Sequence, residues 1–315
     1  MAKKDSSISI VIAGAAGSGI QTVEQLLVQT FKANGFHVFA SKEYMSRVRG
    51  GSNTTQIRIF DSPVCAPLSR IDLAIPLDKD ALGHIQSRLS KKTLILGEKT
   101  VLGADLAAMV DVPFSKIALE LGNKIYANNV AVSVAAALLG VKQDVVLECV
   151  RRFFAKKSAD IVSGNCEAIK RGYDFVRQSL PVDKISKMIP APKGDKEVEK
   201  DILSGGAQAL SLGALAAGCN FISSYPMSPS TGVLTYLSGV QEKFNLIAEQ
   251  AEDEISAINM ALGASYAGGR AMVTTSGGGF ALMEEGVSLA GMIETPVVIH
   301  VAQRPGPATG LPTRT

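Results

Sequence analysis

Short β-branched apolar runs alternate with helix-patterned segments in both halves of the chain, and this alternation most restricts the possible folds. The run SISIVIAG (residues 7–14) is short and continuous, which is typical of a buried parallel strand. Residues 19–35 follow with apolar side chains at helical spacing and a terminal glycine, and residues 37–44 form a second strand-like run. Strand, glycine turn, helix and strand predict a βαβ unit, so we expect an α/β domain with a parallel sheet.

The same alternation continues to the end of the chain. In the first half it predicts strands over 55–60, 72–77 and 92–97 and helices over 126–140, 142–157 and 165–179. In the second half it predicts helices over 205–219, 252–269 and 280–294 and strands over 220–226, 270–276 and 296–302. The second half is therefore expected to be another α/β unit, of the doubly wound type.

A change of composition separates the two halves. Residues 180–203 contain three prolines and many lysines, with little apolar periodicity, which is typical of a linker. We therefore expect a first domain over 1–179, a linker over 180–203 and a second domain over 204–315.

Charge and cysteine usage exclude several classes of protein. The net charge is only +3, from 32 basic and 29 acidic residues, and no basic block is long enough to follow a phosphate backbone, so nucleic acid is not an expected partner. The longest apolar run, NNVAVSVAAALLGV, falls short of a membrane span, and the N-terminus has no signal-peptide core, so we expect a cytoplasmic protein without a membrane partner. The four cysteines form no CxxC pair, which predicts buried reduced thiols, no metal site and an iron–sulfur carrier only on another chain.

The first glycine loop, GAAGSGI (14–20), lies between a predicted strand and a predicted helix. Its glycines could let backbone amides approach a phosphate at the helix N-terminus. The spacing is GxxGxG, however, and not the GxGxxG of dinucleotide-binding turns, and no GK[ST] follows. Tight turning and close packing explain these glycines equally well, and a nucleotide site here remains the less favoured alternative.

The second half contains two stretches that can position polar groups. In YPMSPST (225–231) two prolines flank Ser228 and hold its hydroxyl on a stiffened, extended segment. In AEQAEDEISA (248–257) four carboxylates open a helix; capping explains three of them, and a fourth could point into a cleft where burial raises its pKa.

Three further positions could bind anions or a cofactor. Ser276 precedes three glycines and a helix, which is a possible backbone-amide site. Arg304 follows a strand and precedes a proline-rich turn that would hold its guanidinium for a carboxylate. Lys42 lies at the carboxyl end of the second strand, where open α/β sheets place their ligands.

Together these stretches resemble a known family. YPMSPST, QAEDEISAINMALGASYAGGRAMVTTSGGGFALM and ETPVVIHVAQRPGPATGLPTRT are similar to the α-subunit core of the 2-oxoacid:ferredoxin oxidoreductases. GAAGSGIQ, SRVRGG and QIRI resemble the γ domain of that family, and the γ-before-α order is similar to the fused large subunit of enzymes such as 2-oxoglutarate synthase. The resemblance implies an N-terminal γ-type βαβ domain and a second domain that binds the pyrimidine end of thiamine diphosphate.

The resemblance also implies a reaction and a set of partners. These enzymes decarboxylate a 2-oxoacid with thiamine diphosphate, pass electrons through Fe–S clusters to ferredoxin and release an acyl-CoA from coenzyme A. The diphosphate and its Mg²⁺ would belong to a β subunit, the Fe–S cluster would lie on a partner, and the assembly would be a heterodimer or heterotetramer. The fused domain order favours 2-oxoglutarate as substrate.

Site residues carry over from the matching motifs. Glu252 matches the glutamate that activates the cofactor, and the cofactor contacts carried over are Pro226, Ser276 and Gly277. Such a glutamate hydrogen-bonds the pyrimidine ring through a carboxyl that keeps or shares its proton in an apolar pocket. A fully hydrated glutamate would activate the cofactor poorly.

The substrate contacts carry over in the same way. Ser228 and Arg304 match the hydroxyl and the guanidinium that contact the substrate, with Thr309 and Thr313 beside them and Lys42 as a further contact. The prolines beside Ser228 would then pre-position a donor, so that little entropy is lost when substrate binds.

The sequence also departs from the family pattern. TSGGG stands where TSGPG is usual, GPAT where GPST is usual, and the first glycine loop lacks GGQG. The chain stops inside the GLPTRT motif, which suggests a fragment of a longer subunit. An NAD(P)-binding dehydrogenase domain, which would need Glu43 to face the first glycine loop, and a non-catalytic module on the same fold remain the alternatives.

Overall fold

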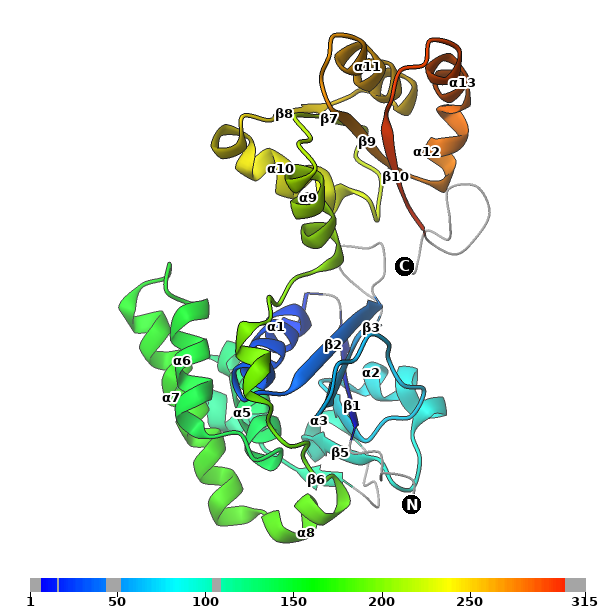
Figure 1. Ribbon diagram of the computed structural model, residues 1–315. Coiled ribbons are helices and arrows are strands. Elements are labelled where there is room, and N and C mark those ends of the chain that lie inside the picture. The colour runs from blue at the N-terminus through cyan, green and yellow to red at the C-terminus, as the bar shows by residue number, and fades with distance from the viewer. Residues whose placement is uncertain (1–6, 16, 44–51, 104–108, 304–315) are drawn as a thin grey trace. The chain divides into compact units, whose positions relative to one another are not determined.

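The computed structural model describes residues 7–15, 17–43, 52–103 and 109–303 (Figure 1). The chain divides into two compact units, Met1–Leu203 and Ser204–Thr315. Each unit is an α/β domain with its own sheet, as the alternation of apolar runs predicts.

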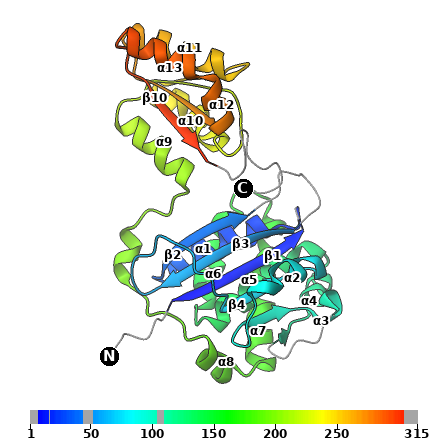
Figure 2. The ribbon, with the colours of Figure 1, turned by 90° about the vertical axis from the view of Figure 1, so that its right-hand side faces the viewer.

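The first unit is built on a six-stranded sheet of order β2-β3-β1-β4-β5-β6. Its strands are β1 (Ile8–Ala15), β2 (His37–Glu43), β3 (Ser52–Phe60), β4 (Leu73–Pro76), β5 (Leu94–Gly97) and β6 (Met109–Asp111). Strands β1, β4, β5 and β6 are parallel, whereas β3 pairs antiparallel with both β1 and β2. Figure 2 shows β3 between β2 and β1, so the predicted βαβ unit exists but its two strands are not neighbours.

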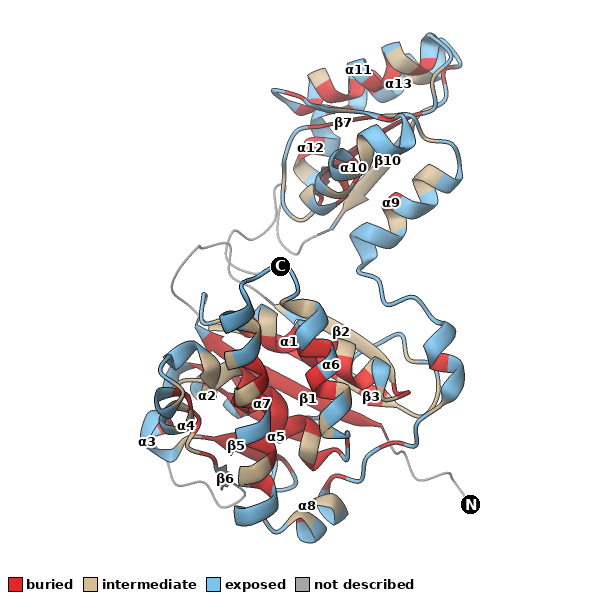
Figure 3. Ribbon diagram, turned by 90° about the vertical axis from the view of Figure 1, so that its left-hand side faces the viewer, coloured by how far each residue is buried: buried red, intermediate tan, exposed pale blue. Residues whose placement is uncertain are grey.

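Helices cover both faces of this sheet. They are α1 (Ile20–Ala33), α2 (Lys79–Ile85), α3 (Lys99–Leu102), α4 (Phe114–Glu120), α5 (Ala127–Leu138), α6 (Gln143–Phe153), α7 (Ala159–Ser179) and α8 (Val182–Met188), with the 3₁₀ turns η1 (Gln86–Arg88), η2 (Lys124–Tyr126) and η3 (Lys196–Lys200). Because side chains of a strand alternate between faces, Ile10 and Ile12 of β1 enter the core with α1 and α5, whereas Val11 enters the core with α2. The buried residues follow the strands and α5 (Figure 3).

The segment 180–203 differs from the free linker that its composition suggests. Ile185 and Val198 are buried against the first unit. The amide of Asp195 donates to the carbonyl of Gly35 at 2.7 Å, and its carboxylate lies 3.2 Å from His37 Nε2. The hydrogen bond from the amide of Glu197, and then that from His37, lower the pKa of Asp195. Widely spaced apolar residues and one carboxylate therefore hold this segment on the first unit, although it has no continuous periodicity.

The four cysteines are free thiols. Cys149 and Cys166 are buried as expected, and burial raises the pKa of the Cys149 thiol. The prediction of burial is wrong for Cys65, which is exposed because it lies in the irregular segment between β3 and β4.

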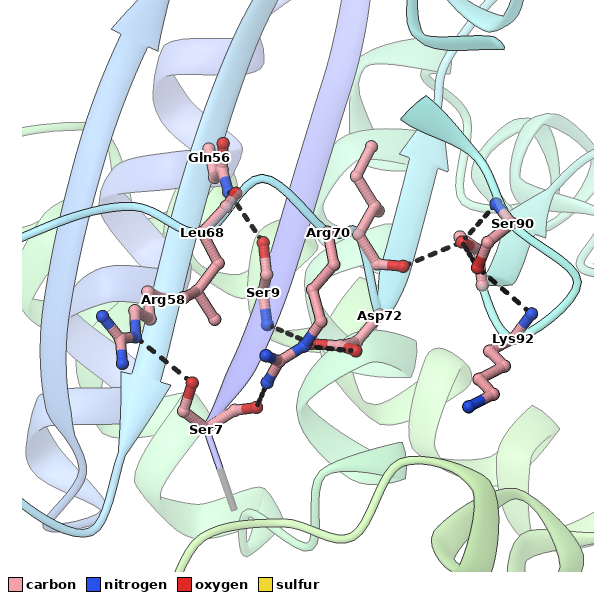
Figure 4. Close-up of polar contacts among 11 residues, drawn as sticks. Ser7, Ser9, Gln56, Arg58, Leu68, Arg70, Asp72, Ser90 and Lys92 are labelled. Atoms are coloured by element: carbon pink, nitrogen blue, oxygen red, sulfur yellow. Dashed lines mark hydrogen bonds and ion pairs between the residues drawn. The ribbon is translucent and has the colours of Figure 1, made fainter. Parts of the chain in front are cut away.

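A polar network, buried at Ser9 and Gln56 and exposed at Arg70, fixes the chain at the beginning of β1 (Figure 4). Gln56 on β3 donates from Nε2 to Ser9 Oγ at 2.8 Å and to the carbonyl of Leu68. The carboxylate of Asp72 accepts from the Ser9 amide at 2.8 Å and from Arg70 Nε at 3.2 Å. Because Ser9 is fully buried, these contacts replace water for groups that would otherwise be unsatisfied.

Replacing Gln56 by leucine is expected to destabilise the first unit by about 2 kcal/mol, because Ser9 Oγ and the Leu68 carbonyl lose their donor. Arg88, which donates to Gln56 Oε1 at 2.8 Å, loses its acceptor as well. Denaturant unfolding followed by circular dichroism measures the change. The matched control is Gln86→Leu at an exposed position, expected to stay within about 0.5 kcal/mol of wild type; equal effects of the two changes would contradict the prediction.

The second unit has a four-stranded parallel sheet of order β10-β9-β7-β8. Its elements are α9 (Gly206–Ala216), β7 (Phe221–Ser224), α10 (Thr231–Phe244), β8 (Ile247–Gln250), α11 (Glu254–Tyr266), β9 (Ala271–Ser276), α12 (Gly277–Leu282), α13 (Glu284–Met292) and β10 (Val298–Ala302). Met272 of β9 packs in the core with α9 and α10, and Val273 packs in the core with α11. This is the doubly wound arrangement expected from the sequence. Throughout the described ranges, every helix is too short or too polar to cross a bilayer.

Candidate functional site

The carboxyl edge of the second sheet is the natural ligand site of this fold. All four strands run in the same direction, so the segments after β7, β8 and β9 begin at one edge. The chain goes from β7 to one neighbour, β8, and then crosses to the other neighbour, β9, so the strand order reverses between β7 and β9. Open α/β sheets bind ligands outside the carboxyl ends of the strands at such a reversal.

Two serines link the elements at this edge by hydrogen bonds. Ser224 Oγ at the end of β7 donates to the carbonyl of Thr274 on β9 at 2.7 Å, and Ser223 Oγ donates to the carbonyl of Ala257 on α11 at 2.6 Å. Both serines are fully buried. The two strands and the helix start are therefore fixed relative to one another by hydrogen bonds as well as by packing.

The turn after β7 contains the proline-flanked serine. Ser228 and Pro226 are exposed at the edge, and the Ser228–Pro229 peptide bond is cis. Ser230 closes the turn, because its amide and its hydroxyl both donate to the carbonyl of Met227, at 2.9 and 2.6 Å. The hydroxyl of Ser228 is thus available at the edge, on a segment whose ends are held.

Three acidic residues at the start of α11 differ in exposure and in their contacts. Glu252 is exposed, which does not suit a carboxyl that must keep its proton in an apolar pocket. Asp253 is the helix cap, since its Oδ1 accepts from the Ser256 amide at 2.6 Å. Glu254 is buried, with only 3% of its surface exposed.

Glu254 is the functional candidate that the sequence reasoning missed. Helical spacing from Glu254 leads to Ala257, Ile258 and Ala261, all fully buried, so Glu254 lies on the core-facing side of α11. That spacing is visible in the sequence, but it separates Glu254 from Glu252 only once the side of α11 that faces the core is known. No donor within the described ranges reaches Glu254 Oε1, and a buried acceptor without a partner is costly.

A second buried polar atom lies at the end of β9. Ser276 is 1% exposed, and its Oγ also lacks a partner among the residues that the structure describes. Gly277, which follows it, is exposed. On the neighbouring strand His300 contacts Thr274 Oγ1 through Nδ1 at 2.8 Å, and burial lowers the pKa of His300. The edge therefore combines a carboxyl and a hydroxyl that are both buried, each with a polar atom that lacks a partner among the described residues.

The remaining predicted substrate residues do not belong to the described part of the second unit. Arg304, Thr309 and Thr313 lie outside the described residues. Lys42 is in the first unit, where its ammonium lies 3.0 Å from the carboxylate of the buried Glu24. This ion pair competes with any anionic substrate for Lys42.

The first glycine loop has the geometry of a tight turn. Gly17 and Gly19 have φ of 86° and 88°, and Asn128 Nδ2 donates to the Ser18 carbonyl at 3.0 Å. A cavity of about 170 Å³ beside the loop is lined by the carboxylate of Glu98, which accepts from the Ser115 amide at 2.9 Å. A carboxylate there repels a phosphate.

The dinucleotide-binding alternative also fails at the second strand. Glu43 is on β2, which β3 separates from β1, so it lies two strand spacings, about 10 Å, from the strand that carries the loop. Its carboxylate accepts from Thr54 Oγ1 at 3.1 Å and lies 3.5 Å from His84 Nε2. Glu43 therefore has local partners on its own part of the sheet.

A larger cavity, of about 510 Å³, lies at the beginning of β9 and β10. Its lining is mostly apolar, from residues such as Leu210, Met272 and Val298, and includes no carboxylate. His300 also lines this cavity, but no carboxyl group stands beside its imidazole there, whereas the carboxyl edge combines a buried carboxyl with a buried hydroxyl. The carboxyl edge therefore remains the candidate site.

Comparisons with known proteins match both units. Residues 9–175 match the family model described as pyruvate ferredoxin/flavodoxin oxidoreductase, and residues 212–315 match the model described as pyruvate flavodoxin/ferredoxin oxidoreductase, thiamine diP-binding. The 2-oxoacid:ferredoxin oxidoreductase subunit alpha of Sulfolobus sp is 28% identical, over 98% of this chain and 56% of the relative. The 2-oxoglutarate synthase subunit KorA of Archaeoglobus fulgidus is 44% identical over 37% of this chain and 33% of the relative.

A solved structure has the same fold over almost the whole chain. The 2-oxoglutarate:ferredoxin oxidoreductase from Magnetococcus marinus superposes with a TM-score of 0.86 at 27% identity, covering 98% of this chain and 54% of that chain. The chain thus spans little more than half the length of the relatives that it matches end to end. The first of the two family models alone covers more than half of these 315 residues. On this match the chain belongs to the pyruvate ferredoxin/flavodoxin oxidoreductase family.

Proposed function

We propose that this chain is the γα portion of the large subunit of a thiamine-diphosphate-dependent 2-oxoacid:ferredoxin oxidoreductase. The reaction is the oxidative decarboxylation of a 2-oxoacid to an acyl-CoA, with the electrons passed to ferredoxin. The observation that carries the proposal is the buried Glu254 carboxyl, whose Oε1 has no partner within the described ranges, at the carboxyl edge of the unit that matches the thiamine diphosphate model.

The residues of this edge fit the aminopyrimidine end of the cofactor. An aminopyrimidine presents ring nitrogens and an amino group, which need a carboxyl and further hydrogen-bonding groups in a dry pocket. Glu254 Oε1 and Ser276 Oγ are buried polar atoms that a ligand of this kind would satisfy. When bound, thiamine diphosphate supplies the electron sink for decarboxylation of the 2-oxoacid.

Glu254 replaces Glu252 in the proposed catalytic role. Its carboxyl lies on the apolar side of α11, where it would hydrogen-bond a ring nitrogen of the cofactor. Glu252, which is exposed, remains at the rim. Pro226, Ser276 and Gly277 are the other proposed cofactor contacts.

The proposed substrate contacts are Ser228, Arg304, Thr309 and Thr313. Ser228 donates its hydroxyl to the 2-oxo or carboxylate group, and Arg304 binds the carboxylate in a bidentate manner. Lys42 is a further contact only if the substrate displaces its ion pair with Glu24.

The proposed substrate is 2-oxoglutarate. In support, the Archaeoglobus relative is named a 2-oxoglutarate synthase subunit, and the Magnetococcus structure carries 2-oxoglutarate, coenzyme A and succinyl-CoA. Coenzyme A is accordingly the proposed acyl acceptor. The cytoplasm is the proposed location.

The proposed partners are a β subunit that holds the diphosphate and Mg²⁺, an Fe–S cluster on a partner, and ferredoxin. The surface of the second unit supports a heteromer. Strands β8 and β10 are the sheet edges, and Ile247 and Val298 on them are 56% and 63% exposed. Tyr266 and Met292 are 78% and 81% exposed, and apolar surface of this extent is typical of interfaces.

The test is turnover by the complex that co-purifies with this chain. Viologen reduction is measured with coenzyme A, thiamine diphosphate and Mg²⁺, in turn with 2-oxoglutarate, pyruvate and a branched-chain 2-oxoacid. We expect 2-oxoglutarate to have the highest kcat/KM, by at least about tenfold. Failure of every 2-oxoacid would contradict the proposed reaction, and direct reduction of NAD(P)⁺ by the chain alone would favour a dehydrogenase.

A further inference from the structure

We propose that Gly279 is a positioning residue for Glu254: the side chain that it lacks leaves the space in which the Glu254 carboxyl lies. Gly279 is the third glycine of the SGGG segment and is buried inside α12. The packing part of this inference stands on contacts alone, and its consequence for turnover rests on the proposed function.

The contacts leave no room for a side chain at position 279. A Cβ atom there would lie 2.7 Å from Glu254 Cγ and 2.9 Å from Glu254 Oε1, and it would overlap Thr275 Oγ1. Carbon atoms in good contact are about 3.5–4.0 Å apart, so a methyl group cannot be accommodated without movement. Glu254 therefore packs directly on the backbone of α12.

Backbone conformation does not explain this glycine. Gly279 lies within a helix, and its φ is outside the left-handed region that favours glycine. In such a position alanine is the better helix former. The requirement for glycine at 279 is therefore one of space and not of conformational freedom.

An anion site at the start of α12 does not explain it either. The helix has only six residues, and Gly277, at its first position, is exposed while Gly279 is buried. The glycine that the sequence suggested as part of a backbone-amide site instead contacts a carboxyl side chain. This contact joins two motifs, QAEDEISA and TTSGGG, that are separated in the sequence.

Packing on the core side of α11 indicates the direction in which the Glu254 side chain would be displaced. The next turn of α11 on the same face is filled by Ala257 and Ile258, which are fully buried, so the carboxyl cannot move deeper into the core. A methyl group at 279 drives it toward the strand edge and solvent. The carboxyl then leaves the position that the cofactor requires, and a displacement of about 1 Å can cost about 100-fold in rate.

The first test needs no cofactor and measures hydrogen–deuterium exchange of the full chain by mass spectrometry. We expect Gly279→Ala to speed amide exchange in the first turn of α11. Glu254→Ala is expected to reduce that effect, because it removes the overlap with the Glu254 side chain and leaves only that with Thr275 Oγ1. The control is Gly263→Ala on the exposed side of the same helix, where a Cβ atom meets nothing within 4 Å. If Gly279→Ala does not accumulate as folded protein, the double variant with Glu254→Ala is expected to do so.

The second test measures kcat and KM in the assembled complex. Gly279→Ala is expected to lower kcat about 100-fold with KM for the 2-oxoacid within about threefold, while Gly263→Ala behaves as wild type. Adding Thr275→Ala removes the other overlap, and it is expected not to restore kcat.

The two tests separate failure of the inference from failure of the proposed function. The positioning role of Gly279 would be overturned by either of two results. One is that Gly279→Ala changes exchange equally with and without the Glu254 side chain, and the other is that Thr275→Ala fully restores kcat. If the exchange effect of Gly279→Ala depends on the Glu254 side chain but the turnover of Gly279→Ala is normal, the packing of Glu254 on Gly279 is supported and the catalytic role of Glu254 is overturned.

Discussion

Replacing Glu254 by glutamine is expected to lower kcat of the assembled complex by about 1,000-fold, within the range of 10²–10⁴ typical for a general acid–base group. The amide keeps the size of the side chain and its packing on Gly279, but it cannot exchange a carboxyl proton with the cofactor. Since the substitution is nearly isosteric, the complex should still assemble and bind thiamine diphosphate. The measurement is viologen reduction at saturating 2-oxoacid, with cofactor binding measured in parallel.

Glu252→Gln is the matched control, because Glu252 is two residues away and exposed. We expect its kcat to stay within about twofold of wild type, because an exposed side chain at the rim of the site is not the carboxyl that the buried pocket presents to the cofactor. A large loss with Glu252→Gln and normal activity with Glu254→Gln would mean that Glu252, and not the buried Glu254, is the catalytic carboxyl.

Replacing Phe31 by alanine is expected to destabilise the first unit by about 4 kcal/mol, in the range measured for large aromatic residues in cores. Phe31 lies on α1, has no exposed surface, and its ring centroid lies 6.2 Å from that of Phe36. The substitution removes apolar surface from the core and leaves a cavity between α1 and the sheet. Denaturant unfolding followed by circular dichroism measures the loss.

Leu119→Ala provides the control for this change, since Leu119 on α4 is 54% exposed. Its effect is expected to be less than about 1 kcal/mol, because little apolar area leaves the core. Comparable losses for the two substitutions would mean that the core identified around α1 does not carry the stability of this unit.

Local sequence was sufficient to find most strands and long helices, although β6 and α10 were not predicted, and it did not show all of the strand pairings. The apolar runs predicted β1, β2 and β3 close to their observed bounds. They could not show that β3 pairs antiparallel with both neighbours and separates β2 from β1, because strand pairing depends on residues distant in the sequence. Residues 180–203 were misjudged for a similar reason: Ile185 and Val198 are too far apart to give a periodic pattern, yet both are buried.

The sequence predicts the candidate site only as far as a short acidic segment. The motif located the acidic start of α11, and capping was correctly predicted for part of it, as Asp253 shows. Choosing between Glu252 and Glu254 required knowing which side of the helix faces the sheet. Only the packed structure gives that, through Ala257 and Ile258 in the core and Gly279 beneath the carboxyl.

The sequence by itself determined two α/β units, their order and the family, because strand and helix periodicity and the motif residues are local properties of the chain. The tertiary structure decided which carboxyl is buried, why position 279 is glycine and how the first sheet is ordered. These depend on which distant segments come into contact, since burial and close approach are properties of the packed core and not of any single stretch.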